Sequence, residues 1–249
     1  MNASVVAETA LRDSRRLLHM VQAFGRAAGT DETPVAASLL CQAWAVSVTR
    51  AAIASLVGAR RMPDLAAANT VLSVDGDGRP AEASLLTPRF AAVAGDPDAA
   101  TALGAELVAD DEALFDWARV RLFDGHLGPL VEALHDLAPV GRRLLWGNVA
   151  AATAGAFAGL SAQATYASTP ERLLADARRL LDRPGSPTEG LAEVFAVPHN
   201  GGARLFVRRQ TCCLRYRLPD APPTCLSCRL VPESERRRRI AARLEHVAV

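Results

Sequence analysis

The 249-residue sequence contains no lysine, so all 28 of its basic side chains are arginines. Reactions that need a lysine amine as Schiff-base former or general base are therefore excluded, and every fixed cation is a planar guanidinium suited to carboxylate-like groups. The 27 acidic residues bring the formal net charge to +1, which does not favour a nucleic-acid or membrane-surface binder. Half of the residues are hydrophobic, enough to bury a sizeable core.

The first residues lack the uninterrupted apolar run of a signal peptide, because Arg12, Arg15 and Arg16 fall where that run would have to be. We therefore expect a cytoplasmic protein, with any membrane contact at most peripheral. Thiols stay reduced in the cytoplasm, so clustered cysteines indicate metal or redox chemistry before structural disulfides. The sequence also lacks a Ser/His/Asp signature, a phosphate-cradling glycine loop and an HExxH motif.

Hydrophobic periodicity predicts a mainly helical α+β protein. Helices are expected over Ser4–Gly25, over the strongly apolar Pro34–Arg61 and over Pro97–Leu137, the last broken near Gly125 and Gly128. Two hairpins are expected where alternating apolar residues flank turn sequences, in "NTVLSVDGDGRPAEASLL" around DGDG and in "EVFAVPHNGGARLFVRRQ" around HNGG.

Turn and capping residues predict how the chain is divided. Thr169 and Pro170 are typical of a helix start, and "DRPGSPTEG" after that helix is the best linker in the chain. We expect residues 1–183 to form a mainly helical body and residues 184–249 to carry the second hairpin, the cysteines and a last helix capped by Ser234, with both parts packed as one unit. The arginine run Arg236–Arg239 on that helix is expected to face solvent.

A stretch of 25 residues from Leu144 carries no charge, which is long enough to span a bilayer. It consists mostly of Ala, Gly, Ser and Thr, which insert weakly into a membrane. Small residues recur every four positions at Gly147, Ala151, Gly155 and Gly159, so a helix would present a face that another backbone can approach closely. The segment is therefore expected to be a buried central helix.

Four of the five cysteines lie in "TCCLRYRLPDAPPTCLSC", which begins at Thr211. Cys212 and Cys213 are adjacent, and after eleven residues Cys225 and Cys228 form a C-x2-C pair. The fifth, Cys41, lies within an apolar helix and is expected to be a buried, inert thiol.

Three kinds of site could use these four thiols. A structural zinc ion wants two C-x2-C turns aimed at one point, and only the second pair has that form. Disulfides, or a thiol relay, would need a strained bond between neighbours in a reducing compartment. A [2Fe–2S] cluster needs two thiolates on each of two irons, which an adjacent pair and a C-x2-C turn can supply. The spacing favours the cluster and leaves the other two open.

The run "RRQTCCLRYRLPDAPPTCLSCRL" resembles the C-terminal signature of the FhuF-like siderophore ferric reductases, with the aromatic and basic "LRYRLP" after the paired cysteines. "LLWGN", from Leu144 to Asn148, resembles a second block of that family. The resemblance implies a [2Fe–2S] cluster on Cys212, Cys213, Cys225 and Cys228. The spacer here is eleven residues and contains Pro222 and Pro223.

The resemblance also implies an activity: the one-electron reduction of Fe(III) held by a siderophore, which releases iron in the cytoplasm. Because the sequence has no Rossmann or flavin fingerprint, we expect a separate electron-donor protein, ferredoxin-like or a flavoprotein. Trp146 and Asn148 are expected to contact the ferric siderophore, together with Arg215 and Arg217. A cluster-bearing redox sensor or electron-transfer module, and a zinc-stapled interaction protein, are the alternatives.

Six arginines surround the cysteines in sequence, against one acid, Asp220. Nearby cations favour the more negative, reduced form of a cluster and would raise its reduction potential. They would also attract an anionic chelate or an acidic donor protein. Plain solvation of the surface explains them equally well. The six are Arg204, Arg208, Arg209, Arg215, Arg217 and Arg229.

Overall fold

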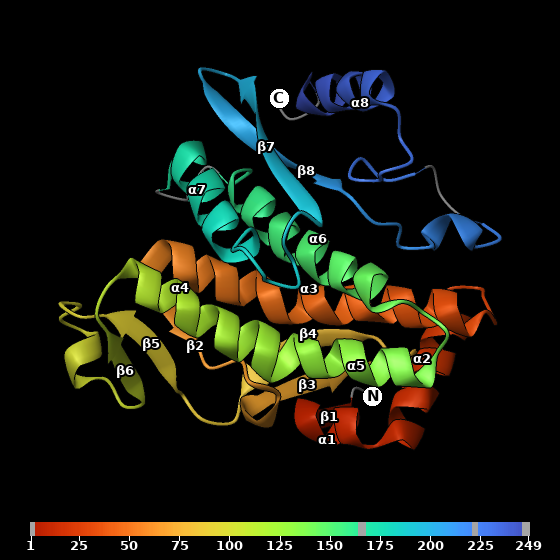
Figure 1. Ribbon diagram of the computed structural model, residues 1–249, viewed down its shortest axis with the longest axis horizontal. Helices are drawn as coiled ribbons and strands as arrows, with labels where there is room; N and C mark the ends of the chain where they lie inside the picture. Colours follow the sequence, from red (N-terminus) through yellow and green to blue (C-terminus); the bar gives the residue numbers. More distant parts are fainter. Residues whose placement is uncertain (1–2, 164–167, 221–223, 246–249) are drawn as a thin grey trace.

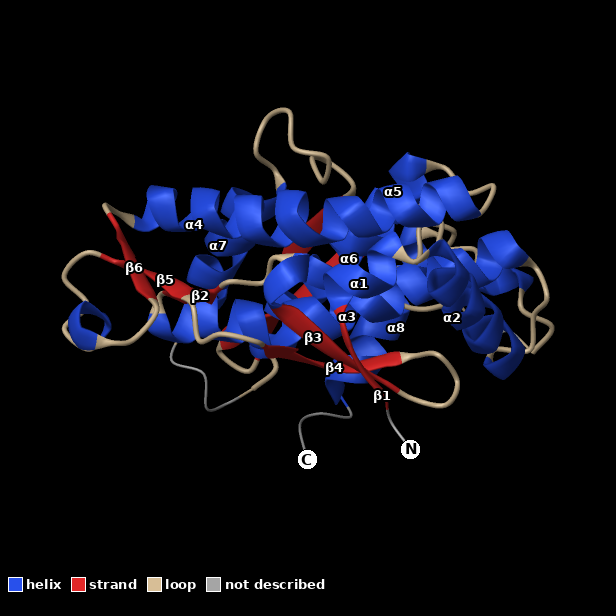
Figure 2. Ribbon diagram, turned by 90° about the horizontal axis from the view of Figure 1, so that it is seen from below, coloured by secondary structure: helices blue, strands red, loops and turns tan. Residues whose placement is uncertain are grey.

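Two long helices, α3 (Thr33–Ala59) and α6 (Arg142–Leu160), lie against each other at the centre of the molecule. The computed structural model that shows this describes residues 3–163, 168–220 and 224–245. Small sheets lie around this helical centre (Figures 1 and 2). The predicted mainly helical α+β class is confirmed.

The other helices cover the central pair. α4 (Asp111–Arg119), the π-helical segment η3 (Val120–Leu127) and α5 (Gly128–Leu137) form a nearly continuous rod. Its irregular middle turn lies where the sequence placed a break. The remaining helices are α1 (Ala7–Arg12), α2 (Ser14–Ala27), α7 (Pro170–Leu181) and α8 (Glu233–Glu245), with short 3-10 turns η1 (Ala67–Asn69), η2 (Ala99–Thr101) and η4 (Arg215–Arg217).

Both predicted hairpins are present. The DGDG turn joins β3 (Thr70–Val74) to β4 (Pro80–Leu85), and the HNGG turn joins β7 (Ala192–His199) to β8 (Gly202–Arg209). β1 (Ala3–Val6) extends the first hairpin by pairing with β3. Another sheet, of β2 (Arg61–Pro63), β5 (Phe90–Val93) and β6 (Ala105–Val108), was not anticipated.

Two predicted helices were wrong at their first residues. Val5 and Val6 pair with β3 instead of starting a helix, and the chain then breaks at Asp13, whose side chain accepts the Arg16 N–H and caps α2. The helix expected from Pro97 begins only at Asp111, because the residues before it form η2 and β6. β6 pairs in parallel with β5, a long-range contact that local periodicity does not reveal.

The C-terminal segment packs on the helical centre. β7 and β8 contact α6 and α7, and Thr169 caps α7 as predicted by accepting the Arg172 N–H. The expected linker is an ordered turn in which the buried Thr188 hydroxyl donates to the carbonyl of Leu181 at 2.8 Å. α8 begins at Glu233, one residue before the cap expected at Ser234.

Length and composition alone make α3 a helix that could cross a membrane. In the molecule 56% of its most apolar window is buried, against α6 and α2 among others. More than half of this apolar window is therefore buried in the protein core. The uncharged segment from Leu144 supplies α6, which is the predicted central helix. The close approach expected along its small residues is found at Gly147 but not at Gly155 or Gly159, which are exposed and where an added Cβ meets no atom within 4 Å.

The core contains a histidine, His126, that is held neutral. Its Nε2 accepts a hydrogen bond from the Trp44 indole N–H at 2.9 Å, and its Nδ1 lies 2.7 Å from the carbonyl of Leu65. Burial lowers the pKa of His126 to about 4, against the smaller opposing effect of the Leu65 hydrogen bond. The ring therefore satisfies both partners as a neutral imidazole with its proton on Nδ1.

This histidine makes stability depend on pH. The unfolded chain takes up the proton near pH 6.5 and the folded protein only near pH 4, so stability falls as the pH is lowered between these values. The expected loss from this residue is roughly 3 kcal/mol. Urea unfolding of wild type and His126→Gln across that range measures it. If the free energy of unfolding fell equally steeply with pH in the two proteins, His126 would not be the source of the pH dependence.

Candidate functional site

The paired cysteines follow the last residues of β8. Leu214 adopts a left-handed backbone conformation with φ of 64°, and this bend directs its N–H to the Cys212 sulfur at 3.3 Å. Cys213 is buried, and its carbonyl accepts a hydrogen bond from the Ser38 hydroxyl on α3 at 2.9 Å. The adjacent thiols are thus fixed to the central helix pair rather than carried on a free loop.

The C-x2-C pair forms a tight turn in which the Cys228 N–H donates to the carbonyl of Cys225 at 3.0 Å. Cys225 is exposed, and its sulfur lies 3.4 Å from the Ser227 hydroxyl. The Arg209 N–H, at the end of β8, donates to the carbonyl of Ser227 at 2.9 Å. This bond joins the second pair to the strand that leads into the first pair.

α8 holds the C-x2-C turn from the other side. The Arg236 guanidinium is 2% exposed and donates to the carbonyls of Leu226 and Cys228. Arg239 donates to the carbonyl of Thr224 at 2.7 Å. The expectation that the whole run faces solvent was therefore wrong for Arg236 and Arg239, which lie three residues apart on one face of the helix.

The four thiols lie close enough for their charges to interact. Burial raises the pKa of Cys228, and negative charge on Cys225, Cys213 and Cys212 raises it further. Among the described residues, no three His, Cys, Asp or Glu side chains are grouped tightly enough to hold one metal ion. The four cysteines are thus neighbours that do not converge on a single point.

A buried polar network links the cysteines to both central helices. The Asn148 amide N–H2 donates to the carbonyl and hydroxyl of Ser38, at 2.8 and 2.9 Å. The Arg209 guanidinium donates to the side-chain oxygen Oδ1 of Asn148 and, at 3.0 Å, to the side-chain oxygen Oε1 of Gln42. Since Ser38 in turn bonds Cys213, the network fixes the position of the first cysteine pair.

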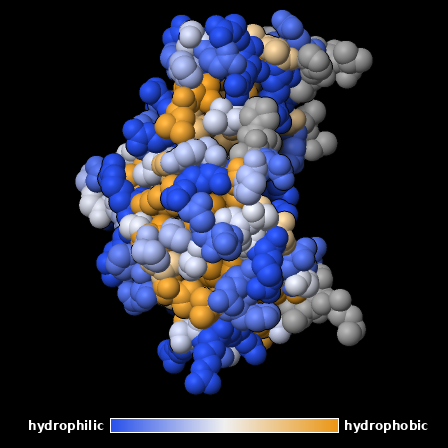
Figure 3. Space-filling view, turned by 90° about the vertical axis from the view of Figure 1, so that its right-hand side faces the viewer, coloured by the Kyte–Doolittle hydropathy of each residue, from blue (hydrophilic) through white to orange (hydrophobic). Residues whose placement is uncertain are grey.

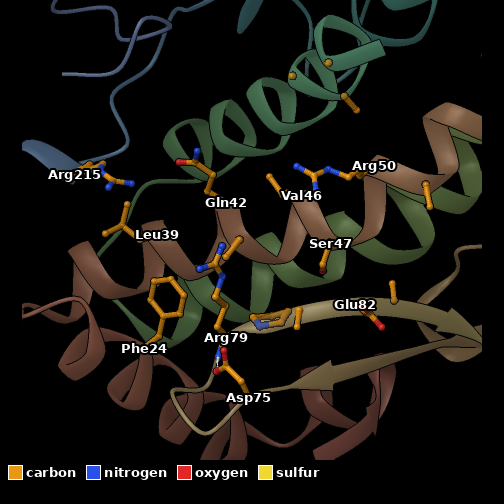
Figure 4. A pocket seen from close by; sticks show the side chains of 18 of the residues that line it. Phe24, Leu39, Gln42, Val46, Ser47, Arg50, Asp75, Arg79, Glu82 and Arg215 are labelled. Carbon is orange, nitrogen blue, oxygen red and sulfur yellow. Dashed lines mark hydrogen bonds between the residues drawn. The ribbon is translucent and has the colours of Figure 1, made fainter. Parts of the chain in front are cut away.

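A long groove runs beside the cysteine segment, with a volume of about 1560 Å³. α3 forms its floor, β4 with the preceding turn forms one wall, and α6 and the segment after Cys213 form the other. In Figure 4 Arg79 extends from the turn before β4, Arg215 lies on the segment after Cys213, and Gln42 and Arg50 extend from α3. A second hollow, of about 680 Å³, is lined by Cys212 itself with Arg143 and Arg229.

The chain matches a known protein family over more than half of its length. The family described as "Ferric iron reductase FhuF-like transporter" matches residues 38–204. The chain belongs to this FhuF-like family. Its matched region contains α3, α6 and β7 but ends before the four cysteines. No curated protein matches the chain at a significant level.

Two residues of the "LLWGN" block in this FhuF-like protein pack inside the molecule. Asn148 is fully buried with both amide groups bonded as above, so it positions the cysteine segment and presents no surface to a ligand. Trp146 lies edge-to-face on Phe123, with ring centroids 6.3 Å apart. Neither residue lines the groove or the smaller hollow. The geometry therefore does not support direct contact with a substrate by Asn148. Trp146 is only partly buried, and its contact with a substrate stays a prediction.

The two arginines expected at the substrate differ in their surroundings. Arg215 is exposed and lines the groove. Arg217, two residues further on, forms an ion pair with Glu32 just before α3. Arg215 keeps the position a substrate contact needs, whereas Arg217 ties the cysteine segment to the helical body. Pro222 and Pro223 lie outside the described residues.

Sequence reasoning missed how Ser38, Arg209 and Arg236 hold the cysteines in place. Ser38 and Arg209 bond groups far away in the sequence, and Arg236 bonds carbonyls eight and ten residues before it, but an isolated Ser or Arg gives no local sign of such a partner. A partial signal existed for Arg236, because it shares a helix face with Arg239.

The residues present fit the iron–sulfur cluster that the resemblance implies. The donor set is four thiols with a backbone N–H already directed at the Cys212 sulfur. In the described part of the chain, five buried side-chain nitrogen or oxygen atoms have no hydrogen-bond partner, and two of them lie near the cysteines: Thr211 Oγ1, which faces Gly147, and Arg236 Nε, which lies 3.6 Å from a Glu233 carboxylate oxygen.

Proposed function

We propose that this protein reduces siderophore-bound Fe(III) to Fe(II) in the cytoplasm, using a [2Fe–2S] cluster held by Cys212, Cys213, Cys225 and Cys228. One observation carries the proposal: a chain of the FhuF-like ferric reductase family has four neighbouring thiols beside a groove of about 1560 Å³. Such a cluster, when bound, supplies one electron at a time. The protein supplies position and charge.

Reduction is sufficient to release the iron. Siderophores surround Fe(III) with hard, anionic oxygen donors that match a hard trivalent ion. Fe(II) carries less charge and is softer, so the same oxygens bind it less tightly. One electron therefore frees the metal without breaking the chelator, and no general acid, base or nucleophile has to act.

The groove suits the substrate in size. Typical small-molecule pockets measure about 300–1,000 Å³, and a chelator wrapped around iron needs more room than an ordinary metabolite. The groove holds about 1560 Å³. In the described structure Arg50, Arg79 and Arg215 line it without an ion pair, so their guanidinium groups can donate to oxygen ligands of the chelate. Arg215 comes two residues after Cys213 and places one end of the groove beside the thiols.

Filling the groove should weaken substrate binding without disturbing the cysteines. A Cβ added at Gly155 meets no atom within 4 Å, so Gly155→Trp places an indole in the groove. The dissociation constant of the ferric siderophore should rise at least about tenfold, with an unchanged iron content. Val120→Trp, at an exposed position that does not line the groove, is the control. Equal affinity in both variants and wild type would place the substrate elsewhere.

Electrons have to reach the cysteines from a separate protein. The hollow lined by Cys212 carries Arg143 and Arg229, and Leu230 beside it is 53% exposed. Two arginines at this hollow favour an acidic donor such as a ferredoxin or a flavoprotein. Figure 3 shows the face of the molecule at the right-hand side of Figure 1, where hydrophobic patches lie between hydrophilic ones.

A single-turnover experiment tests the function. The protein is reduced anaerobically, freed of reductant and mixed with a ferric siderophore while a ferrous chelator reports Fe(II). We expect close to one Fe(II) per reduced cluster. The visible spectrum should return to that of the oxidised cluster at the rate at which Fe(II) appears. A cluster that stays reduced would support the redox sensor instead. A colourless, zinc-containing protein would support the interaction module.

A further inference from the structure

One of the six arginines around the cysteines differs from the rest. Arg209 is 2% exposed, whereas Arg204 is half-buried and Arg208, Arg215 and Arg229 are exposed. Its guanidinium donates only to neutral oxygens, those of the Gln42 and Asn148 side chains, and its Nε has no partner. No carboxylate in the described residues pairs with it.

A buried cation without a counter-charge is strongly unfavourable. The fifth cysteine, Cys41, does not provide the missing negative charge. Cys41 is fully buried and donates to the carbonyl of Leu145, and burial raises its pKa to about 12 even though the charge of Arg209 acts in the opposite direction. Cys41 therefore stays a neutral thiol, and the compensation has to come from elsewhere.

The surroundings of Arg209 connect it to both pairs of cysteines. Its backbone N–H bonds Ser227, inside the C-x2-C turn. Its guanidinium bonds Asn148, which bonds Ser38, which bonds the carbonyl of Cys213. A permanent positive charge is thus anchored between α3 and α6, where a chain of hydrogen bonds links it to Cys213, on a residue whose main chain bonds the C-x2-C turn.

We infer that Arg209 is a positioning residue of the cysteine centre that compensates the negative charge of its thiolates and raises its reduction potential. The inference rests on the proposed cluster. Reduction adds one negative charge to a group already made negative by its thiolate ligands, and a fixed cation nearby stabilises that added charge.

Midpoint potentials from EPR-monitored redox titration test this in the full-length, cluster-loaded protein. Arg209→Gln keeps hydrogen-bonding groups and removes the charge, so its equilibrium constant for reduction should fall at least about tenfold, which is ~59 mV for one electron. Arg209→Lys keeps the charge and should stay within about threefold of wild type. Arg208→Gln removes an exposed charge one residue away and is the matched control, expected within about twofold.

The gain in thermal stability when iron and sulfide bind is a second measurement, for a variant that takes up too little cluster for a redox titration. Arg209→Gln should gain less thermal stability on loading than wild type, and Arg209→Lys should recover most of the gain. Equal potentials in Arg209→Gln and Arg208→Gln would overturn the inference, as would loss of loading in both Arg209 variants, since lysine retains the charge. If wild type itself binds no cluster, the proposed function fails, before any potential is measured.

Discussion

Cys225→Ser is expected to remove bound iron almost completely while leaving the fold intact. The Cys225 side chain is exposed, and its sulfur contacts the neighbouring Ser227 hydroxyl. Its replacement therefore costs little packing energy. A serine oxygen is a poor substitute for a thiolate on iron, so the loss reports the ligand alone. Iron and acid-labile sulfide contents, with the unfolding temperature as a check, measure it.

Cys41→Ser is the matched control. Cys41 is fully buried, and a serine hydroxyl can make the same bond to the carbonyl of Leu145. This variant should keep its iron and the wild-type visible spectrum, even if it unfolds at a somewhat lower temperature. Equal loss of iron in both variants would mean that the ligands are wrongly assigned.

Gly147→Ala is expected to displace the paired cysteines from the central helix. A Cβ added at Gly147 would lie 1.8 Å from the Thr211 hydroxyl oxygen and 2.7 Å from the Thr211 Cβ and Cγ2. Thr211 is buried, branched at Cβ and directly precedes Cys212, so relief requires movement of the main chain that carries the thiols. Overpacking of this kind costs about 1–3 kcal/mol, and iron content should fall with it.

The same substitution at Gly155, two turns along α6, separates this clash from any general effect on the helix. A Cβ there meets nothing within 4 Å, and alanine should stabilise the helix by up to about 1 kcal/mol. Adding Thr211→Gly to Gly147→Ala should recover part of the lost iron. If Gly147→Ala and Gly155→Ala unfold alike and bind equal iron, α6 does not position the cysteines as described.

The sequence predicted those features that local signals determine. Alternating residues around DGDG and HNGG predicted both hairpins, Thr169 and Pro170 predicted the start of α7, and the composition of the uncharged segment predicted the central helix α6. Each follows from backbone conformation or side-chain period within a few residues. The parallel pairing of β5 and β6 has no such local sign.

The sequence singled out four thiols as candidate ligands, a role that stays a prediction, but it did not indicate which residues hold those thiols in place. Cysteine spacing and the family resemblance were enough to single out the four thiols. Asn148 was expected to bind substrate, yet it holds Ser38 and Arg209, because a polar residue on an apolar helix does not reveal its partner. Gly147 was expected to let another segment of backbone approach α6 closely. The sequence did not show that this segment contains Thr211, because that depends on how β8 packs on α6.

The central claim is that the four cysteines hold a [2Fe–2S] cluster, and protein purified without oxygen tests it most directly. Iron and acid-labile sulfide are assayed, and EPR spectra are recorded after dithionite reduction. The account predicts about two irons and two sulfides per chain and a rhombic signal in the reduced form. A colourless protein with one zinc ion and no signal would contradict it.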